Sequence, residues 1–347
     1  MFAGPLRKTC CVLLIILGTA FLARIFYKET EATFGCNLTQ PMGYWHQGKF
    51  KWINARCETE DILSLIDSRN LPSPMHVLLI GDSHSQRMVM YTCSKIYATL
   101  HHWLGGYAVM FSKSAQRRVR RKVHCWCAKN DFAIANLYHF GYFNGTYFNH
   151  NRFVGEYTDT WSKLSYELPK ISNWVPNFAP HLVVLSFSGY DNAGVIFAPE
   201  NGVNQKTTPF LQRLVDKTKA NRPTERARWL KSLPILVDRL SLAAGVLKAN
   251  FPHSQLAWST FIEPSLMGPY EPEYSKVLNM FAKFQMAKDH PDVLLFDISS
   301  IMAGRHHDYV DLLHLKPEFY SEILNMYLLE LRGPFYSPWM RFFLGAK

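Results

Sequence analysis

Short apolar segments of strand length alternate with longer segments of helical periodicity from residue 75 onward, and this alternation constrains the fold more than any other feature. The apolar segments are MHVLLI (75–80), GYAVMF (106–111), FAIANLYHF (132–140), HLVVLSF (181–187), QLAWSTFI (255–262) and DVLLFDI (292–298). Several are apolar without interruption, which is typical of strands in a parallel sheet covered by helices on both faces. The sequence therefore predicts an α/β fold, a three-layer α/β/α sandwich with a mostly parallel sheet.

Helices are expected between these strands. Apolar residues recur at helical spacing over 85–104, 228–251, 272–288 and 317–332. Pro234 lies within the second of these segments, where we expect it near a turn or a kink.

The start of the chain predicts a membrane anchor. After Arg7 and Lys8, the segment CCVLLIILGTAFLA runs without a charge, and continuing to Tyr27 gives about 18 residues, near the lower limit for a span. Basic residues before the apolar run favour a cytoplasmic tail and a translocated body. Gly18-Thr19-Ala20 also fits a cleavage site, so a cleaved signal peptide and a secreted protein remain an alternative.

The expected organisation divides the chain into five parts. A region with two tryptophans and two cysteines (Trp45, Trp52, Cys36, Cys57) follows the anchor, and we expect it to pack on the main domain. The parts are a cytoplasmic tail (1–8), a transmembrane signal anchor (9–27), a lumenal stem or cap (28–70), a catalytic domain (71–332) and a C-terminal tail (333–347).

Two further features are consistent with the secretory pathway. Asn37 and Asn144 begin N-glycosylation sequons. Five cysteines follow the anchor, so at most two bridges form among them and one thiol is left over. Cys125 and Cys127 are too close for an easy mutual bridge, and we expect them to have different partners. Metal-ligand spacing is not apparent in the sequence, so no metal or cofactor is expected.

A net charge of +11 favours anionic partners. In the secretory pathway a nucleic-acid partner is improbable, which leaves acidic glycans and membrane headgroups. The run RRVRRK (117–122) is either a solvated loop or part of an acidic-polysaccharide surface.

Gly81-Asp82-Ser83 directly follows the first strand of the predicted sheet. Ligands of open parallel sheets bind beyond the carboxyl ends of the strands. Ser83 would also lie at the start of the next helix, where amides and the helix dipole stabilise an anion. As a nucleophile, Ser83 needs a histidine base oriented by a carboxylate. Asp311 and His314 offer this pair, three residues apart and just before the last helix.

These segments resemble the SGNH (GDSL-type) hydrolase superfamily. IGDSHSQ is similar to its first block, DLLHL to its last, and APHLVVLSFSGYDNAG (179–194) to its third, although Asp191-Asn192 reverses the usual order. The anchor and the segments GYW (43–45) and KWINARC (51–57) resemble its membrane-anchored PC-esterase and trichome-birefringence-like branch. In the plant members of this branch tryptophan follows the catalytic histidine, whereas this chain has Leu315 there.

The resemblance implies an O-acyl transferase of the Golgi or ER membrane that acts on glycan hydroxyls through an acyl-serine. The catalytic residues would be Ser83, Asp311 and His314, and the oxyanion donors would be the Ser83 amide, the Asn192 side chain and a glycine amide, preferably Gly141 rather than Gly105 or Gly106. A transferase with one membrane span would need a separate acyl-donor supply. An SGNH esterase and a non-catalytic glycan-binding protein on the same fold remain alternatives.

Overall fold

The structure is a computed structural model of the whole chain. It describes residues 43–46, 49–52, 61–69, 74–103, 124–138, 164, 167–186, 222–262, 272–305, 308–310 and 314–331.

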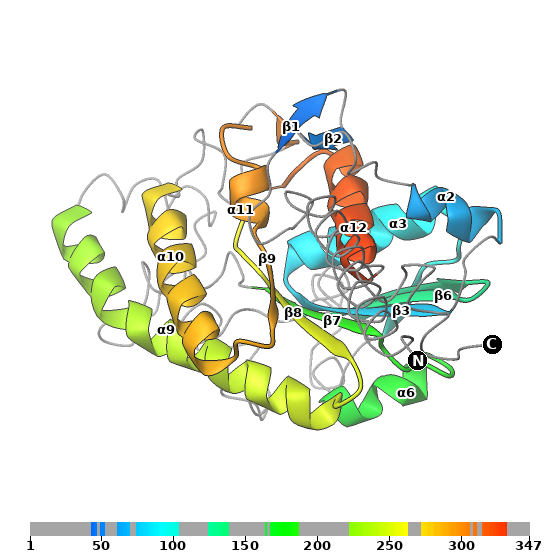
Figure 1. Cartoon of the computed structure of the whole chain (residues 1–347), viewed down its shortest axis with the longest axis horizontal. Coiled ribbons are helices and arrows are strands. Elements are labelled where there is room, and N and C mark those ends of the chain that lie inside the picture. Colours follow the sequence, from blue (N-terminus) through cyan, green and yellow to red (C-terminus); the bar gives the residue numbers. More distant parts are fainter. Residues whose placement is uncertain are drawn as a thin grey trace, which may run out of the picture.

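A seven-stranded sheet forms the centre of the molecule (Figure 1). Its strands, in spatial order, are β4 (His101–Trp103), β5 (His124–Lys129), β6 (Phe132–Tyr138), β3 (Met75–Gly81), β7 (Leu182–Ser186), β8 (Gln255–Ser259) and β9 (Leu294–Phe296). The five strands from β6 to β9 are parallel, while β5 is antiparallel to both of its neighbours. The predicted mostly parallel sheet is confirmed.

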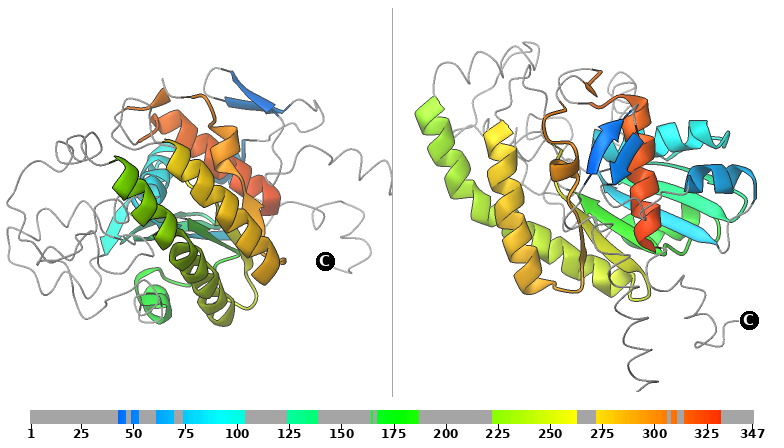
Figure 2. Two further views of the ribbon diagram at one scale, coloured as in Figure 1. Left: turned by 90° about the vertical axis from the view of Figure 1, so that its left-hand side faces the viewer. Right: turned by 45° about the horizontal axis from the view of Figure 1, so that its top comes forward.

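Helices cover both faces of this sheet, each over its own apolar core (Figures 1 and 2). The helices over the first core are α2 (Ile62–Asp67), α3 (Ser83–Lys95), α11 (Ile298–Ile301) and α12 (Pro317–Leu331). Those over the second are η2 (Leu168–Lys170), α6 (Ile171–Trp174), α9 (Arg222–Asn250) and α10 (Pro272–Asp289). Strands with both faces buried explain the uninterrupted apolar runs, and the predicted three-layer sandwich is confirmed.

Five of the apolar runs predicted as strands, over 75–80, 132–140, 181–187, 255–262 and 292–298, each contain a strand, with ends that shift by up to three residues. The expected helices over 272–288 and 317–332 also form. Helix α9 continues through Pro234, and its ribbon bends along its length (Figure 1).

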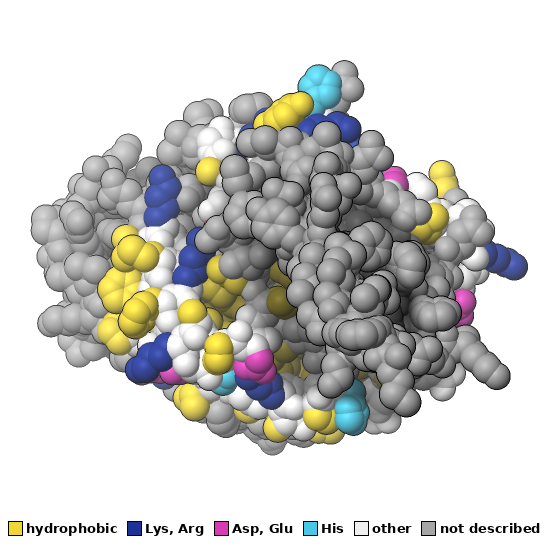
Figure 3. All heavy atoms as spheres, viewed as in Figure 1, with side chains coloured by type: hydrophobic (Ala, Val, Ile, Leu, Met, Phe, Trp, Pro, Cys, Tyr) yellow, Lys and Arg dark blue, Asp and Glu magenta, His cyan; other side chains and the backbone are white. Residues whose placement is uncertain are grey.

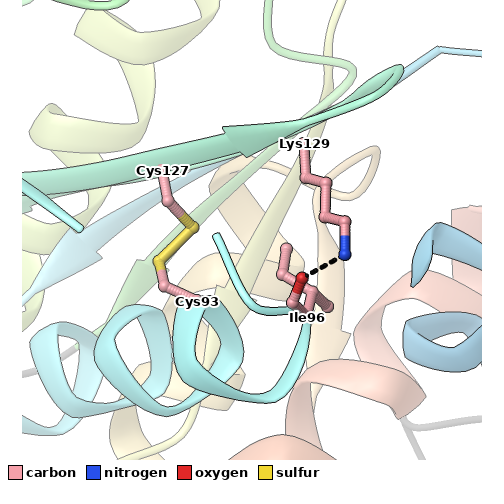
Figure 4. Close-up of a disulfide and its surroundings, with 4 residues drawn as sticks. All are labelled: Cys93, Ile96, Cys127 and Lys129. Carbon is pink, nitrogen blue, oxygen red and sulfur yellow. Dashed lines mark hydrogen bonds between the residues drawn. A yellow bond between two sulfur atoms is a disulfide. The ribbon is translucent and has the colours of Figure 1, made fainter. Parts of the chain in front are cut away.

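The prediction of one helix over 85–104 was wrong at its end. Helix α3 stops at Lys95, Tyr97 adopts a positive φ of 52°, and residues 101–103 form the edge strand β4. The Lys129 ammonium donates to the Ile96 carbonyl at 2.6 Å, as a cation at a helix carboxyl end often does (Figure 4). Long-range pairing with β5, in a segment whose strand the sequence did not reveal, thus ends the helix.

A disulfide joins Cys93 on α3 to Cys127 on β5, across the face between helix and sheet (Figure 4). Cys125 lies on the same strand, two residues from Cys127. Its thiol is free and buried, and burial raises its pKa to about 12. Cys125 and Cys127 do not bridge each other, as expected. The expectation that Cys125 has a different disulfide partner was wrong. Its environment is apolar and keeps the thiol protonated.

The described part of the region before residue 70 packs on the domain, as expected. Strands β1 (Gly43–His46) and β2 (Lys49–Trp52) form an antiparallel hairpin. The Trp45 indole N–H donates to the Ile301 carbonyl at 2.8 Å, and the Phe50 amide donates to the Glu322 carboxylate at 3.3 Å. These contacts fix the hairpin against α11 and α12.

Several predictions lie outside the described residues. They concern the anchor (9–27), the sequons at Asn37 and Asn144, the strand over 106–111 and the tail (333–347). Among the helices that the structure describes, none is both long and apolar enough to cross a membrane.

Candidate active site

Ser83 lies where β3 ends and α3 begins. Asp82, which is almost completely buried, is the N-cap of this 13-residue helix, and its carboxylate accepts a hydrogen bond from the His84 amide at 2.9 Å. Ser83 is therefore the first helical residue, at the positive end of the helix dipole. A negative charge that develops on an atom bound to Ser83 would be stabilised there.

Gly81, the last residue of β3, allows this junction to be tight. A Cβ atom at Gly81 would lie 2.1 Å from the Ser85 Oγ and 2.4 Å from the Ser186 Oγ. Both hydroxyls are held: they lie 3.4 Å apart, and Ser186 donates to the Ile80 carbonyl at 3.2 Å. A side chain at position 81 would displace the first turn of α3, which carries Ser83, or the end of β7.

His314 and Ser83, 231 residues apart in the sequence, meet at this place. The distance from His314 Nε2 to Ser83 Oγ is 2.8 Å, and both side chains are partly exposed. When Nδ1 carries the ring proton, Nε2 accepts the Ser83 hydroxyl proton, which is the geometry that general-base activation of a serine requires.

A short hairpin-like loop positions His314. Tyr309 and Leu315 form an isolated antiparallel bridge, the Val310 amide donates to the His314 carbonyl at 2.8 Å, and the Lys316 amide donates to the Asp308 carbonyl at 2.9 Å. The buried Asp308 carboxylate forms an ion pair with Arg305 and lies 3.7 Å from the Lys316 ammonium. These contacts fix the backbone of residues 308–310 and of residues 314–316, and so the position of His314.

The remaining predicted site residues lie outside the described part of the chain. Asp311 falls between Val310 and His314, Asn192 falls after β7, and Gly141 falls after β6. The strands before Asn192 and Gly141 are the two parallel neighbours of β3, and Tyr138 at the end of β6 pairs with Gly81. The roles of these three residues stay predictions.

Sequence reasoning missed Tyr320, a fully buried residue of α12. Its hydroxyl lies 2.9 Å from His84 Nδ1 and accepts a hydrogen bond from the Leu315 amide at 3.2 Å. Burial raises the pKa of the Tyr320 phenol well above its usual value. The sequence carries no signal for this contact, because the contact depends on how α12 packs on α3.

His84, the residue after Ser83, faces the same site. Its ring centroid lies 5.4 Å from that of His314 and 6.4 Å from that of Phe261. In the part of the chain that the structure describes, no three histidine, cysteine or acidic side chains are grouped as a metal site would need.

No protein-family model and no curated protein matches the chain. Solved structures that are similar to it include the following two. One is an acetyl xylan esterase, 11% identical, with a TM-score of 0.36 over 74% of this chain and 98% of the other. The second, described as a GDSL-like lipase from Parabacteroides merdae, is 12% identical, with a TM-score of 0.38 over 76% of this chain and 98% of the other. The contact between Ser83 and His314 is independent of these similarities.

Proposed function

We propose that the chain is a serine-dependent acyl-transfer enzyme of the SGNH type. The observation that carries the proposal is the 2.8 Å contact between His314 Nε2 and Ser83 Oγ at the amino terminus of α3. A nucleophile, a base and a helix terminus converge at the carboxyl end of a central parallel strand, which is where ligands of such sheets bind.

The proposed reaction is a double displacement. Ser83 Oγ forms a bond to the acyl carbonyl carbon while its proton moves to His314 Nε2. The tetrahedral intermediate collapses, the bond to the leaving oxygen breaks, and His314 returns the proton to that oxygen. A second hydroxyl then attacks the acyl-serine by the same proton path in reverse, which regenerates Ser83.

The supporting residues of this reaction come from the sequence. Asp311 would orient His314 through Nδ1–H, and the oxyanion would accept hydrogen bonds from the Ser83 amide, the Asn192 side chain and the Gly141 amide. In the sequence, Gly141 and Asn192 follow the strands on either side of β3, which supports this assignment.

The second hydroxyl decides between a transferase and an esterase. We propose an O-acetyl transferase whose acceptor is a glycan hydroxyl, with an SGNH esterase that uses water as the alternative. The sequence motifs favour the membrane-anchored PC-esterase branch, a single-pass lumenal enzyme of the Golgi or ER. An acidic glycan fits the net charge of +11. The acyl donor would come from a separate supply.

Labelling with a fluorophosphonate tests the proposal. The lumenal part of the wild type should be labelled, while Ser83→Ala should not. Ser241→Ala is a matched control, because Ser241 also contacts a histidine but lies on the surface of α9, and it should be labelled like the wild type. A wild type that stays unlabelled would favour the non-catalytic glycan-binding protein.

A second assay separates the two enzymatic outcomes. Wild-type protein that has not been treated with the fluorophosphonate is incubated with an acetyl ester donor and an acidic oligosaccharide, and mass spectrometry follows acetyl transfer to the oligosaccharide against release of acetate. Acetylated oligosaccharide supports the transferase, and acetate alone supports the esterase.

A further inference from the structure

The Tyr320 hydroxyl connects the two segments that contain the site residues. It accepts the Leu315 amide proton, next to His314, and it contacts the ring of His84, next to Ser83. Its ring is buried and stacks on Tyr91 of α3, with centroids 5.7 Å apart. The hydroxyl is thus fixed in position by backbone and ring contacts on both sides.

This arrangement determines which atom carries each proton. A backbone amide can only donate, so the Tyr320 oxygen is the acceptor for Leu315. The Tyr320 O–H then needs an acceptor of its own, because a buried donor without one is costly. His84 Nδ1, at 2.9 Å, is an acceptor only when the imidazole is neutral and its proton is on Nε2.

We infer that Tyr320 is a positioning residue that holds His84 as a neutral imidazole with its proton on Nε2, beside Ser83 and His314. A protonated His84 would present two N–H donors and leave the Tyr320 proton without an acceptor. The consequence for catalysis, which rests on the proposed function, concerns charge. His314 must become an imidazolium in the reaction, and a second imidazolium with its ring 5.4 Å away would oppose that.

Other titratable groups surround this pair. On α3 these are Asp82, whose carboxylate accepts the His84 amide, and Arg87 and Tyr91; on the His314 loop the nearest is Tyr309. The Asp82 carboxylate favours a charged His84, and the Arg87 guanidinium opposes it. The Tyr320 hydrogen bond is directional and therefore decides the tautomer.

Nitrogen-15 NMR of histidine-labelled full-length protein tests the inference without any need for catalysis. We expect one ring with a protonated Nε2 and an unprotonated Nδ1 from pH 8 down to pH 5.5, where a histidine of ordinary pKa, about 6.5, is about 90% charged. This ring is assigned to His84 by its absence in His84→Gln. A His84 ring that titrates normally, or that carries its proton on Nδ1, overturns the inference.

The variant Tyr320→Phe extends the test to the reaction. In this variant His84 should titrate near the ordinary pKa of a histidine. The acid limb of the pH profile of kcat/KM for p-nitrophenyl acetate should then show a second ionisation, that of His84. Between pH 7.5 and pH 5.5 the rate should fall about tenfold further than in the wild type. The double variant His84→Gln with Tyr320→Phe should lose this extra ionisation.

The two proposals fail in different ways. A rate loss in Tyr320→Phe that is equal at every pH indicates a merely structural role and contradicts the inference, even if the fluorophosphonate labels Ser83. A wild type that is not labelled and does not hydrolyse the ester contradicts the proposed function. The NMR spectra of that wild type still show whether His84 is neutral with its proton on Nε2. Circular dichroism checks that each variant is folded.

Discussion

Ser83 and Ser241 each lie within hydrogen-bonding distance of a histidine ring, but in different parts of the fold. Ser83 begins a helix at the carboxyl end of β3, whereas Ser241 lies along α9, against the end of α10. Ser241 donates to the Asp289 carboxylate at 2.8 Å, and its Oγ lies 3.1 Å from His290 Nε2. Serine, histidine and aspartate are thus close together at the surface as well.

The hydrogen bonds of the two pairs differ in direction. His290 Nε2 lies 2.8 Å from the Ser241 carbonyl oxygen, which can only accept, so Nε2 carries a proton and cannot act as a base. Ser241 instead donates directly to Asp289. His314 Nε2 faces the Ser83 hydroxyl and is able to accept its proton. Proximity of serine, histidine and carboxylate is therefore insufficient, and the direction of each hydrogen bond determines the chemistry.

Substituting the two histidines should give the largest difference between the pairs. His314→Gln removes the proposed base and should lower kcat for p-nitrophenyl acetate by about 10⁴- to 10⁶-fold. His290→Gln, the matched control, should leave kcat within about twofold. Steady-state kinetics measure both. Equal losses in the two variants would contradict the assignment of His314 as the base.

Substituting the two aspartates should give a smaller difference. Asp311→Asn should lower kcat by about 10²- to 10⁴-fold, because an amide would favour the wrong tautomer of His314. Asp289→Asn should have no effect on kcat. If Asp311→Asn keeps full activity, another carboxylate orients His314, and Asp308 at the base of the same loop is the next residue to substitute.

The parts of the fold that the sequence predicted depend on local patterns. Uninterrupted apolar runs identified β3, β6, β7 and β8, and the spacing of Asp311 and His314 directed attention to the loop before α12. Ser83 and His314 could be paired because a serine nucleophile requires a base and the chain offers one in a motif.

The parts that were missed depend on long-range contacts. Strand β4 was read as the end of a helix because Ile96 and Leu100 continue the helical spacing, and only pairing with β5 reveals it. Strand β5 follows a basic run and alternates cysteine with partly or fully exposed residues. Tyr320 could not be connected to His84 by any spacing, since the contact depends on how α12 packs on α3.

The disulfide stabilises the region around the Ser83–His314 pair and not the region around the Ser241–His290 pair. Helix α3, which begins with Ser83, is tied to β5 by Cys93–Cys127, while the structure describes no such link at α9 or α10. Closing a loop with a sequence separation of 34 should contribute about 3–4 kcal/mol to the free energy of unfolding. Cys93→Ala with Cys127→Ala should lose this amount in urea unfolding.

A reductant provides the control for that measurement. Dithiothreitol should destabilise the wild type by more than it destabilises the double variant, which lacks the Cys93–Cys127 bridge. Cys125→Ala should still respond to dithiothreitol, because Cys125 is not part of the bridge. A wild type insensitive to the reductant under unfolding conditions would contradict the contribution of the disulfide.

The smallest expected effect concerns the surface pair, and it tests the direction of its hydrogen bonds. The hydrogen bond from Ser241, followed by that from Gln285, lowers the pKa of Asp289 below its ordinary value of 3.8. A lowered carboxyl pKa stabilises the folded protein above pH 3.8, and this contribution is lost as the pH falls through the folded-state pKa. Ser241→Ala should therefore raise the pKa of Asp289 part of the way to 3.8, with Gln285 retaining the rest, in an NMR titration of the side-chain carboxyl carbons. An unchanged pKa would mean that the Ser241 hydroxyl does not donate to Asp289, and the contrast with Ser83 would then rest on the His290 contact to the Ser241 carbonyl alone.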